Sequence, residues 1–197
     1  MDDYSHTFSE GGNKLPKLDH ISHSIALPEG VSASIDGEVV TISKEDVSLS
    51  REFRHHKVEI RSVEGGLEVF VNLPRRSDKA LAGTWAAHLR NMARGVYEGF
   101  EYRLKAVFSH FPMSLKVDAA NKQFTITNLF GEKVPRVAKL PWDEVEVLVE
   151  SKTDVVVKGA DREKVGQTAA NIERACRIKK RDRRVFQDGV YIVSKGA

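Results

Sequence analysis

The chain has 197 residues, enough for one large domain or two small ones, and its apolar share of 41% is ordinary for a globular protein. No apolar run approaches the ~20 residues of a membrane-spanning helix, and the chain does not open with a basic segment followed by an apolar one. We therefore expect neither a membrane protein nor a secretory signal. The single cysteine, Cys176, cannot form an internal disulfide, which favours a reducing, intracellular setting.

Charge is unevenly distributed along the chain, although the net charge is only +3. Residues 158–197 hold 11 Lys or Arg and 5 Asp or Glu, while residues 1–157 hold the remaining 20 and 23. The basic character therefore belongs to the C-terminal end. This asymmetry favours a local docking surface for a polyanion over a protein that attracts polyanions everywhere.

The first part of the chain begins with the polar residues 1–24, which predict a flexible N-terminal extension. Ordered structure is expected from Ile25 onward. Alternating apolar residues on both sides of an Asp-Gly pair predict a β-hairpin over residues 31–42. A second hairpin is predicted over residues 57–71, around a pair of glycines.

A helix is predicted after the second hairpin. Large apolar residues recur at steps of three and four over residues 79–96, which places them on one helical face. Ser77 or Asp78 is the expected N-terminal cap of this helix. Residues 100–108 have the composition of a strand.

The same order of elements then starts again. Strands are predicted over residues 114–117 and 123–127, joined as a hairpin or by a wider loop, and a polar connection follows over 131–141. A hairpin from strands 143–150 and 154–158 comes next. It is followed by a helix with Asp161 as its cap and its apolar face over 165–176, and by a final strand over 190–193.

Residues 67–89 and residues 154–172 also share sequence features. In both, a valine-rich strand is followed by a polar turn, a capping residue, a lysine and a threonine-alanine motif. We interpret this as an internal duplication, with chance similarity of two amphipathic units as the alternative. The predicted fold class is therefore α+β, with two tandem similar domains, each built of antiparallel β-hairpins packed on one helix. The expected domains are residues 25–110 and residues 111–197.

The sequence shows no arrangement of residues that is typical of catalysis. It has no phosphate-binding glycine loop, no zinc-protease motif and no nucleophile elbow. His55 and His56 are adjacent, and neighbours on a strand point to opposite faces, which is poor geometry for a metal. Cys176 falls on the apolar face of the second helix, which predicts a buried thiol. We therefore expect no enzyme activity, no cofactor and no metal site.

A dense group of cations separates the second helix from the final strand. Arginine forks bind phosphate oxygens in pairs, and lysine adds point charge. On the second helix, Arg174 is expected about opposite the apolar face and Arg177 toward its edge, where both could extend the same positive patch. The absence of base-stacking and base-clamping motifs favours recognition of a folded RNA by shape and backbone. The alternative is a solvated basic loop. The candidate phosphate-binding residues are Arg174, Arg177, Lys179, Lys180, Arg181, Arg183 and Arg184.

Four stretches of the sequence resemble a known family, the sixth protein of the large ribosomal subunit in its archaeal and eukaryotic branch. They are LPEGV (27–31), HLRNMARGVYEGFEYRLKAVFSHFP (88–112), QTAANIERA (167–175) and RRVFQDGVYIVSK (183–195). The two long stretches are specific to that family. The resemblance covers about residues 25–195.

The resemblance implies a non-catalytic cytoplasmic protein of the ribosome that binds large-subunit ribosomal RNA mainly through its C-terminal domain. It further implies a position near the sarcin-ricin loop and the base of the stalk. The implied partners are neighbouring large-subunit proteins, and neither a membrane nor a small-molecule substrate is expected. It also adds Lys195 to the candidate RNA-binding residues. One departure is residues 43–53, SKEDVSLSREF, where the family usually has a turn rich in glycine, proline and lysine.

Two other functions remain as alternatives. A protein–protein interaction scaffold would use the basic residues only as a solvated rim. A small enzyme acting on RNA would require a cleft with paired carboxylates, which the sequence does not reveal.

Overall fold

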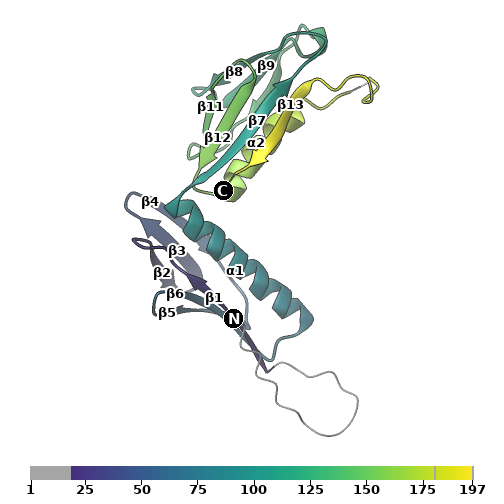
Figure 1. The fold of residues 1–197 in the computed structure, drawn as a ribbon. Helices are drawn as coiled ribbons and strands as arrows, with labels where there is room; N and C mark the ends of the chain where they lie inside the picture. The colour runs from purple at the N-terminus through teal and green to yellow at the C-terminus, as the bar shows by residue number, and fades with distance from the viewer. Residues whose placement is uncertain (1–18, 180, 197) are drawn as a thin grey trace, which may run out of the picture. The chain divides into compact units, whose positions relative to one another are not determined.

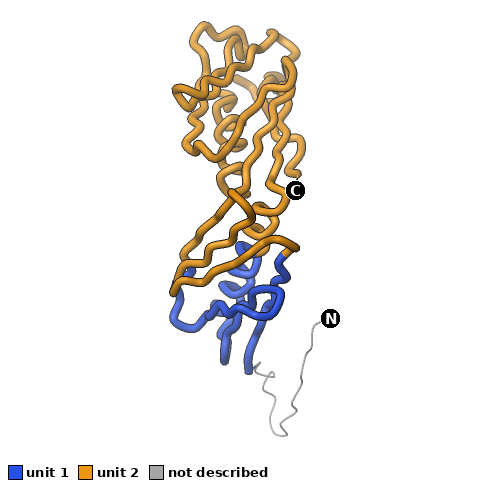
Figure 2. Tube along the Cα trace, turned by 90° about the vertical axis from the view of Figure 1, so that its left-hand side faces the viewer, with its two compact units in different colours: residues 1–27, 53–89 blue, residues 28–52, 90–197 orange. Residues whose placement is uncertain are grey.

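The computed structural model describes residues 19–179 and 181–196 (Figure 1). The chain divides into two compact units, shown in different colours in Figure 2. Unit 1 comprises residues 1–27 and 53–89, and unit 2 comprises residues 28–52 and 90–197. Among the described helices, none combines the length and the apolar character that a bilayer crossing requires.

Unit 1 contains a three-stranded antiparallel sheet in the order β1-β6-β5. Its strands are β1 (His20–Ala26), β5 (Val58–Val63) and β6 (Gly66–Asn72). Alternate residues of β6 are fully buried, because the central strand presents every second side chain to the core. The second predicted hairpin is therefore confirmed as β5–β6.

Strand β1 corrects one prediction. The sequence assigned residues 1–24 to a flexible extension, and the structure pairs His20 with Asn72 and continues the pairing to Ala26. In β1 the more buried positions are Ile21, His23 and Ile25, and the residues between them are exposed. Exposed polar residues suit a strand that has a partner on one side only. The rest of the predicted extension, residues 1–18, lies outside the described residues.

The first predicted helix is confirmed as α1 (Arg76–Tyr97), which begins in unit 1. Its buried side chains follow the expected period, and those in unit 1 are Asp78, Ala82, Trp85, Ala86 and Leu89. The expected cap is wrong by up to three positions, because the helix already starts at Arg76. Asp78 lies inside the first turn, and its carboxylate accepts a hydrogen bond from the backbone N–H of Arg75 at 3.0 Å.

Unit 2 contains a separate three-stranded sheet in the order β2-β3-β4. Its strands are β2 (Ser32–Asp36), β3 (Val39–Lys44) and β4 (Val47–Glu52). The hairpin predicted over residues 31–42 is confirmed as β2–β3. Strand β4 was not predicted, because its polar residues and the preceding Glu45-Asp46 turn hide the short apolar alternation.

The main body of unit 2 is a four-stranded antiparallel sheet in the order β11-β12-β7-β13. Its strands are β7 (Phe100–Val107), β11 (Glu146–Val149), β12 (Asp154–Gly159) and β13 (Gly189–Lys195). The predicted first domain ended at residue 110, yet β7 pairs with β12 and β13, which follow it in the chain. The division into domains 25–110 and 111–197 stays a prediction.

A second sheet of the same body has the order β10-β9-β8. Strands β8 (Ser114–Asp118) and β9 (Gln123–Thr127) confirm a predicted hairpin, and a short helix η1 (Leu129–Gly131) follows them. The expected polar connection over residues 131–141 is wrong in part, because it contains β10 (Arg136–Lys139). The two prolines that bracket β10 hid this four-residue strand from sequence reasoning.

Helix α2 (Arg162–Ala175) covers these strands and contacts β7, β10, β12 and β13. The predicted cap is confirmed, since the Asp161 carboxylate accepts a hydrogen bond from the N–H of Glu163 at 2.8 Å. Val165, Ala169 and Ile172 on its inner face are fully buried in one apolar cluster with the strands. This core fixes where α2 ends and therefore where the basic segment begins.

Candidate nucleic-acid interface

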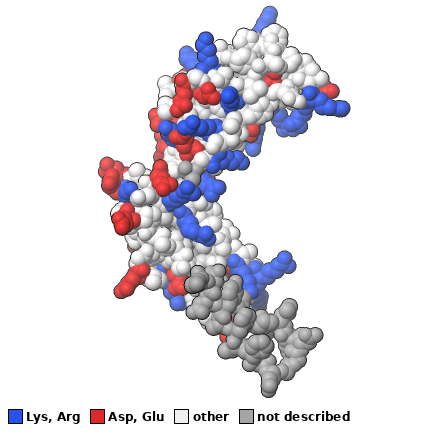
Figure 3. All heavy atoms as spheres, viewed as in Figure 1, with Lys and Arg blue, Asp and Glu red and all other residues white. Residues whose placement is uncertain are grey.

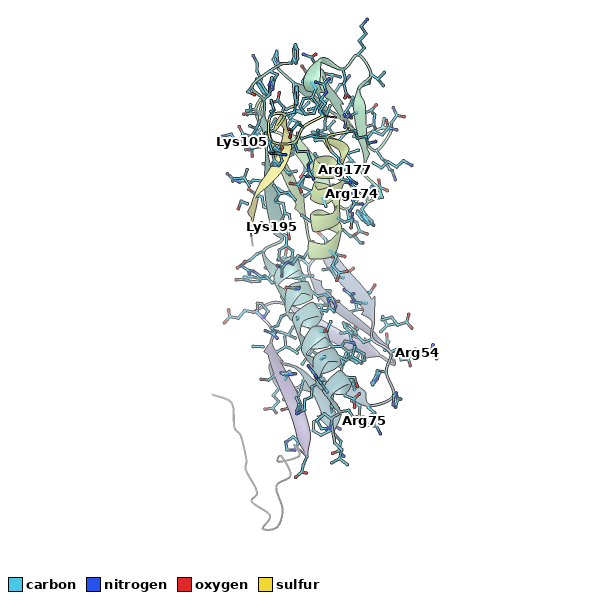
Figure 4. All side chains as sticks on the ribbon, turned by 90° about the vertical axis from the view of Figure 1, so that its right-hand side faces the viewer. Arg54, Arg75, Lys105, Arg174, Arg177 and Lys195 are labelled. Carbon is cyan, nitrogen blue, oxygen red and sulfur yellow. The ribbon has the colours of Figure 1, made fainter. Side chains whose placement is uncertain are left out.

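The candidate basic residues begin at the C-terminal end of α2. Arg174 and Arg177 are exposed on the last turn of the helix and just after it, and Figure 4 shows both at this end. Positive charge is favourable here, because the carbonyl groups at a helix C-terminus carry partial negative charge. The position predicted for these two side chains is therefore compatible with both helix stability and phosphate binding.

The arginine Arg136 on β10 fixes the end of α2. Its Nη1 donates hydrogen bonds to the carbonyl oxygens of Ala175 at 3.1 Å and Arg177 at 2.8 Å. Its Nε and Nη2 donate to both carboxylate oxygens of Glu132, each at 2.8 Å. The Arg136 guanidinium also holds the pKa of the Glu132 carboxyl below its usual range. One half-buried side chain thus satisfies the carbonyl oxygens that the helix leaves open and anchors the basic segment at its start.

A tight turn over residues 182–186 shapes the middle of the basic segment. The carbonyl oxygen of Asp182 accepts hydrogen bonds from the N–H groups of Val185 at 3.2 Å and Phe186 at 2.9 Å. The carboxylate of Asp182 accepts a third, from the N–H of Arg184 at 2.9 Å. The backbone of this turn is therefore set by local hydrogen bonds, which leaves the arginine side chains outside it.

The end of the basic segment is anchored by Asp188, which is 2% exposed. Its carboxylate accepts hydrogen bonds from the backbone N–H groups of Ser109 and His110, both at 3.2 Å, and from the Ser109 hydroxyl at 3.1 Å. The His110 ring nitrogen Nδ1 lies 3.1 Å from the same carboxylate. Burial raises the pKa of Asp188, but the hydrogen bonds from His110 and Ser109 outweigh it and hold the pKa below its usual range.

Aromatic rings connect the same two segments. The rings of His110 and Phe186 are stacked with centroids 5.1 Å apart, and Phe130 meets Phe186 edge-on at 5.8 Å. The guanidinium of Arg181 lies 4.9 Å from the Phe186 ring centroid and 5.2 Å from that of Phe130. Two motifs far apart in the sequence, His110-Phe111-Pro112 and the segment around Phe186, therefore form one packed structure.

The structure gives the clustered cations different roles. Arg181 packs against the aromatic rings, whereas Arg184 has a side chain that is 93% exposed and a long 3.7 Å pair with Asp182, which contributes little in water. Arg183 and Lys179 are also exposed. In Figure 3, blue side chains gather over this loop. Lys180 lies outside the described residues.

Lys195 is not brought together with this group. It pairs with Tyr102 at the far end of β13, while the basic segment precedes Gly189 at the near end. Six steps of ~3.3 Å place the two ends about 20 Å apart. Figure 4 shows Lys195 at this separate position, well away from the end of α2. The proposed contact of Lys195 with RNA stays a prediction.

The thiol of Cys176 lies just after α2 and is buried, as predicted. Burial raises the pKa of this thiol to about 11, so the reactive thiolate is scarce at neutral pH. Within residues 19–179 and 181–196, no group of three or more His, Cys, Asp or Glu is placed to hold a metal ion.

Sequence reasoning missed the residues that position the cations. Arg136, Glu132 and Phe130 lie in a stretch that was expected to be a polar connection, and nothing local connects them to a segment about 40 positions later. His110 and Asp188 had a signal, because both belong to the two specific stretches on which the family resemblance rests. Their joint presence in those stretches could have suggested a contact between them.

Comparisons with known proteins agree with the resemblance. The family model described as ribosomal protein L6 matches residues 27–99 and residues 111–189. The chain is 44% identical over 183 residues to the large ribosomal subunit protein uL6 of Desulfurococcus amylolyticus, covering 92% of this chain and 98% of the relative. It is 45% identical over 181 residues to the protein of the same name from Methanosphaera stadtmanae, covering 92% and 97%. The matches on both halves, with the observed helices and antiparallel sheets, confirm the predicted duplicated α+β fold.

Proposed function

Because this chain belongs to the ribosomal protein L6 family, we propose that it binds folded ribosomal RNA mainly through the basic segment after α2. It is a structural component of the large ribosomal subunit and not an enzyme, as the names of its relatives indicate. Its general partners are the RNA and the proteins of that subunit, and it acts with the ribosome in the cytoplasm.

The observation that supports RNA binding most strongly is the construction of the basic segment. Arg136 anchors its start and Asp188 anchors its end, while the guanidinium groups of Arg183 and Arg184 are exposed. A rigid backbone lowers the entropy that is lost when phosphate oxygens bind. A merely solvated loop would need neither anchor.

The candidate residues divide into three groups under this proposal. Arg183 and Arg184 contact phosphates directly, and Arg174, Arg177 and Lys179 extend the positive surface along the end of α2. Arg181 holds the aromatic rings together and adds charge beside them. Lys180 and Lys195 remain proposed contacts that no described interaction supports.

The proposed binding site on the ribosome is near the sarcin-ricin loop and the base of the stalk. This position follows from the family resemblance stated above. Val185 and Val193, which are 61% and 67% exposed, lie on the same C-terminal part of the chain. Neighbouring large-subunit proteins would cover these apolar groups, since singly exposed valines beside a charged surface suit the rim of a mixed interface.

The test is a salt titration of RNA affinity with the full chain and a large-subunit ribosomal RNA fragment. The variant R183A/R184A removes two exposed charges without disturbing the packing of Arg181. We expect the slope of log K against log salt to fall by about 2, and affinity near 0.1 M salt to fall about a hundredfold.

The matched control is K116A/K139A, which removes two exposed lysines from the sheet β10-β9-β8. It should leave the slope and the affinity close to those of the unmodified chain. Equal losses for both variants would show that only net charge matters, and no loss for R183A/R184A would contradict the proposed site.

A protein–protein scaffold is the second candidate, and the exposed Val185 and Val193 favour it. Complexes purified with this chain should then survive nuclease treatment. Their release by nuclease would exclude the scaffold as the main function.

A further inference from the structure

A second group of cations lies in unit 1, which the charge distribution along the sequence did not reveal. Residues 53–57 and 73–79 together hold five Lys or Arg and one acid, Asp78. Residues 53–57 follow β4, and residues 73–79 lead into α1 and form its first turn. Figure 4 shows Arg54 and Arg75 toward the end of unit 1 at which α1 begins. We name the group the α1 tip, and its members are Arg54, Lys57, Arg75, Arg76 and Lys79.

The single acid of the α1 tip is occupied by internal contacts. Asp78 is 6% exposed, and its carboxylate accepts hydrogen bonds from the N–H of Arg75 at 3.0 Å and the hydroxyl of Ser77 at 3.2 Å. It also pairs with Nζ of Lys57 at 3.8 Å. This buried carboxylate therefore joins the two segments, and it does not offer its charge at the surface.

Aromatic packing holds the first segment against the helix. The Phe53 and Trp85 rings lie 5.2 Å apart, and the His55 ring meets Trp85 edge-on at 6.5 Å. Nδ1 of His55 accepts hydrogen bonds from the N–H groups of Lys57 and Val58, both at 3.3 Å. The cations of both segments therefore stand on a rigid support. In Figure 3, blue side chains gather beside the first turn of α1.

Helix stability does not explain these cations. The N-terminus of a helix carries partial positive charge, so the charges of Arg75, Arg76 and Lys79 are disfavoured there. The helix field and the cations attract the same ligand, an anion. A function that binds anions accounts for an arrangement that folding alone disfavours.

Leu73 adds a second observation at the same place. It is 66% exposed and has a φ of 44°, a left-handed conformation that is rare for a leucine. Its N–H donates to the carbonyl oxygen of Asp19 at 2.7 Å, which holds it in this position. An exposed apolar side chain is therefore held in a fixed position beside the cations of the α1 tip.

We propose that the α1 tip is a second RNA-binding surface, which holds the phosphate backbone of an RNA segment with its five cations and packs Leu73 against the sugar faces. The proposal goes beyond the basic segment after α2 and relies on the proposed function only for the chemical class of the ligand. An acidic protein surface is the competing partner. RNA is favoured because five cations from two segments match a ligand with regularly repeated charge.

The experiment uses the full chain in the R183A/R184A background, so that the contribution of the α1 tip is measured with the main proposed site weakened. The probe is an RNA duplex of about 20 base pairs, somewhat longer than the ~16 that a duplex-binding domain spans. Adding R75A/R76A should reduce affinity about a hundredfold near 0.1 M salt and lower the salt slope by about 2. The charge-preserving variant R75K/R76K should retain the slope.

The outcomes separate the two proposals. If R75A/R76A lowers the slope while R183A/R184A alone does not, the α1 tip stands and the main proposed site fails. If R75A/R76A leaves RNA affinity unchanged, the α1 tip proposal is overturned. If RNA affinity is unchanged but the variant no longer joins the large ribosomal particle, the surface belongs to a protein neighbour, which also overturns it. Thermal unfolding of each variant checks that the fold is intact.

Discussion

The two helices carry their nearby cations at opposite ends. One group lies in and after the last turn of α2, where it complements the partial negative charge of the helix C-terminus. The other lies before and in the first turn of α1, where it opposes the partial positive charge of the N-terminus. Favourable interaction with the helix therefore explains part of the positive charge at the end of α2, and none of the positive charge of the α1 tip. The comparison shows that the position of a charge on an element, and not only its density, indicates whether folding or binding accounts for it.

The supports of the two groups also differ. The segment after α2 is held at both ends by side chains from distant strands, Arg136 at its start and Asp188 at its end. The α1 tip is joined through one carboxylate, that of Asp78, and through Trp85 of the helix itself. Removing an anchor should therefore disturb the segment after α2 more than removal of a surface charge does.

The largest expected effect comes from D188A. It leaves the N–H groups of Ser109 and His110 and the Ser109 hydroxyl without their acceptor, the carboxylate of Asp188. Because several hydrogen bonds to one buried carboxylate are lost together, we expect a loss of about 3 kcal/mol in the free energy of unfolding, measured by denaturant titration. The smaller change S109A should lose about 1 kcal/mol, and a neutral result for D188A would show that the basic segment is not anchored there.

The next effect is R136A, for which we expect a loss of about 2 kcal/mol in stability. RNA affinity should also fall, because the end of α2 and the start of the basic segment loosen. The slope of log K against log salt should stay close to that of the unmodified chain, since the N–H groups of Arg136 already donate hydrogen bonds to protein oxygens. A slope that falls by a full unit would instead make Arg136 a phosphate contact. R136K, which keeps the charge without the paired geometry, should behave like R136A.

A smaller effect is the pH dependence of stability. The pKa of Asp188 is depressed in the folded state, so its contribution is present above the unfolded value of ~3.9 and is lost as pH falls through the lower folded pKa. Acid unfolding of the chain should therefore steepen below about pH 4. D188N, which cannot titrate, should show a shallower acid branch in the same measurement. Parallel curves for the two proteins would contradict the assignment.

The smallest effect concerns the α1 tip. Asparagine tolerates the left-handed conformation better than leucine, so L73N should raise stability by up to ~1 kcal/mol. The same change should weaken RNA binding if Leu73 packs against the ligand. A rise in the unfolding temperature with unchanged affinity would separate Leu73 from the binding surface and leave only the cations there.

The regular elements of the fold were predictable from local pattern. The apolar spacing of α1 and the valine-rich strands β6 and β12 show strong periodicity, and turn residues mark their ends. Strands β1, β4 and β10 were missed because short strands with alternating polar residues resemble loops. Their pairing depends on partners elsewhere in the chain, which no local window contains.

The sequence predicted the positive charge of the candidate site, but it did not predict the contacts that hold the site in place. The density of Lys and Arg after α2 pointed to the candidate surface, because phosphate binding depends chiefly on the number of cations. The anchoring contacts join residues that are far apart, as Arg136 does with carbonyl oxygens 39 and 41 positions later. The α1 tip was not predicted, because acidic residues elsewhere in residues 1–157 offset its cations in the net charge of that part of the sequence.

The most direct test of the whole account is sedimentation of a lysate through a gradient at increasing salt, with this chain followed in every fraction. The account predicts that the chain travels with the large ribosomal particle, and that R183A/R184A is released at lower salt than K116A/K139A. A chain that stays at the top of the gradient, or two variants that leave the particle at the same salt concentration, would contradict it.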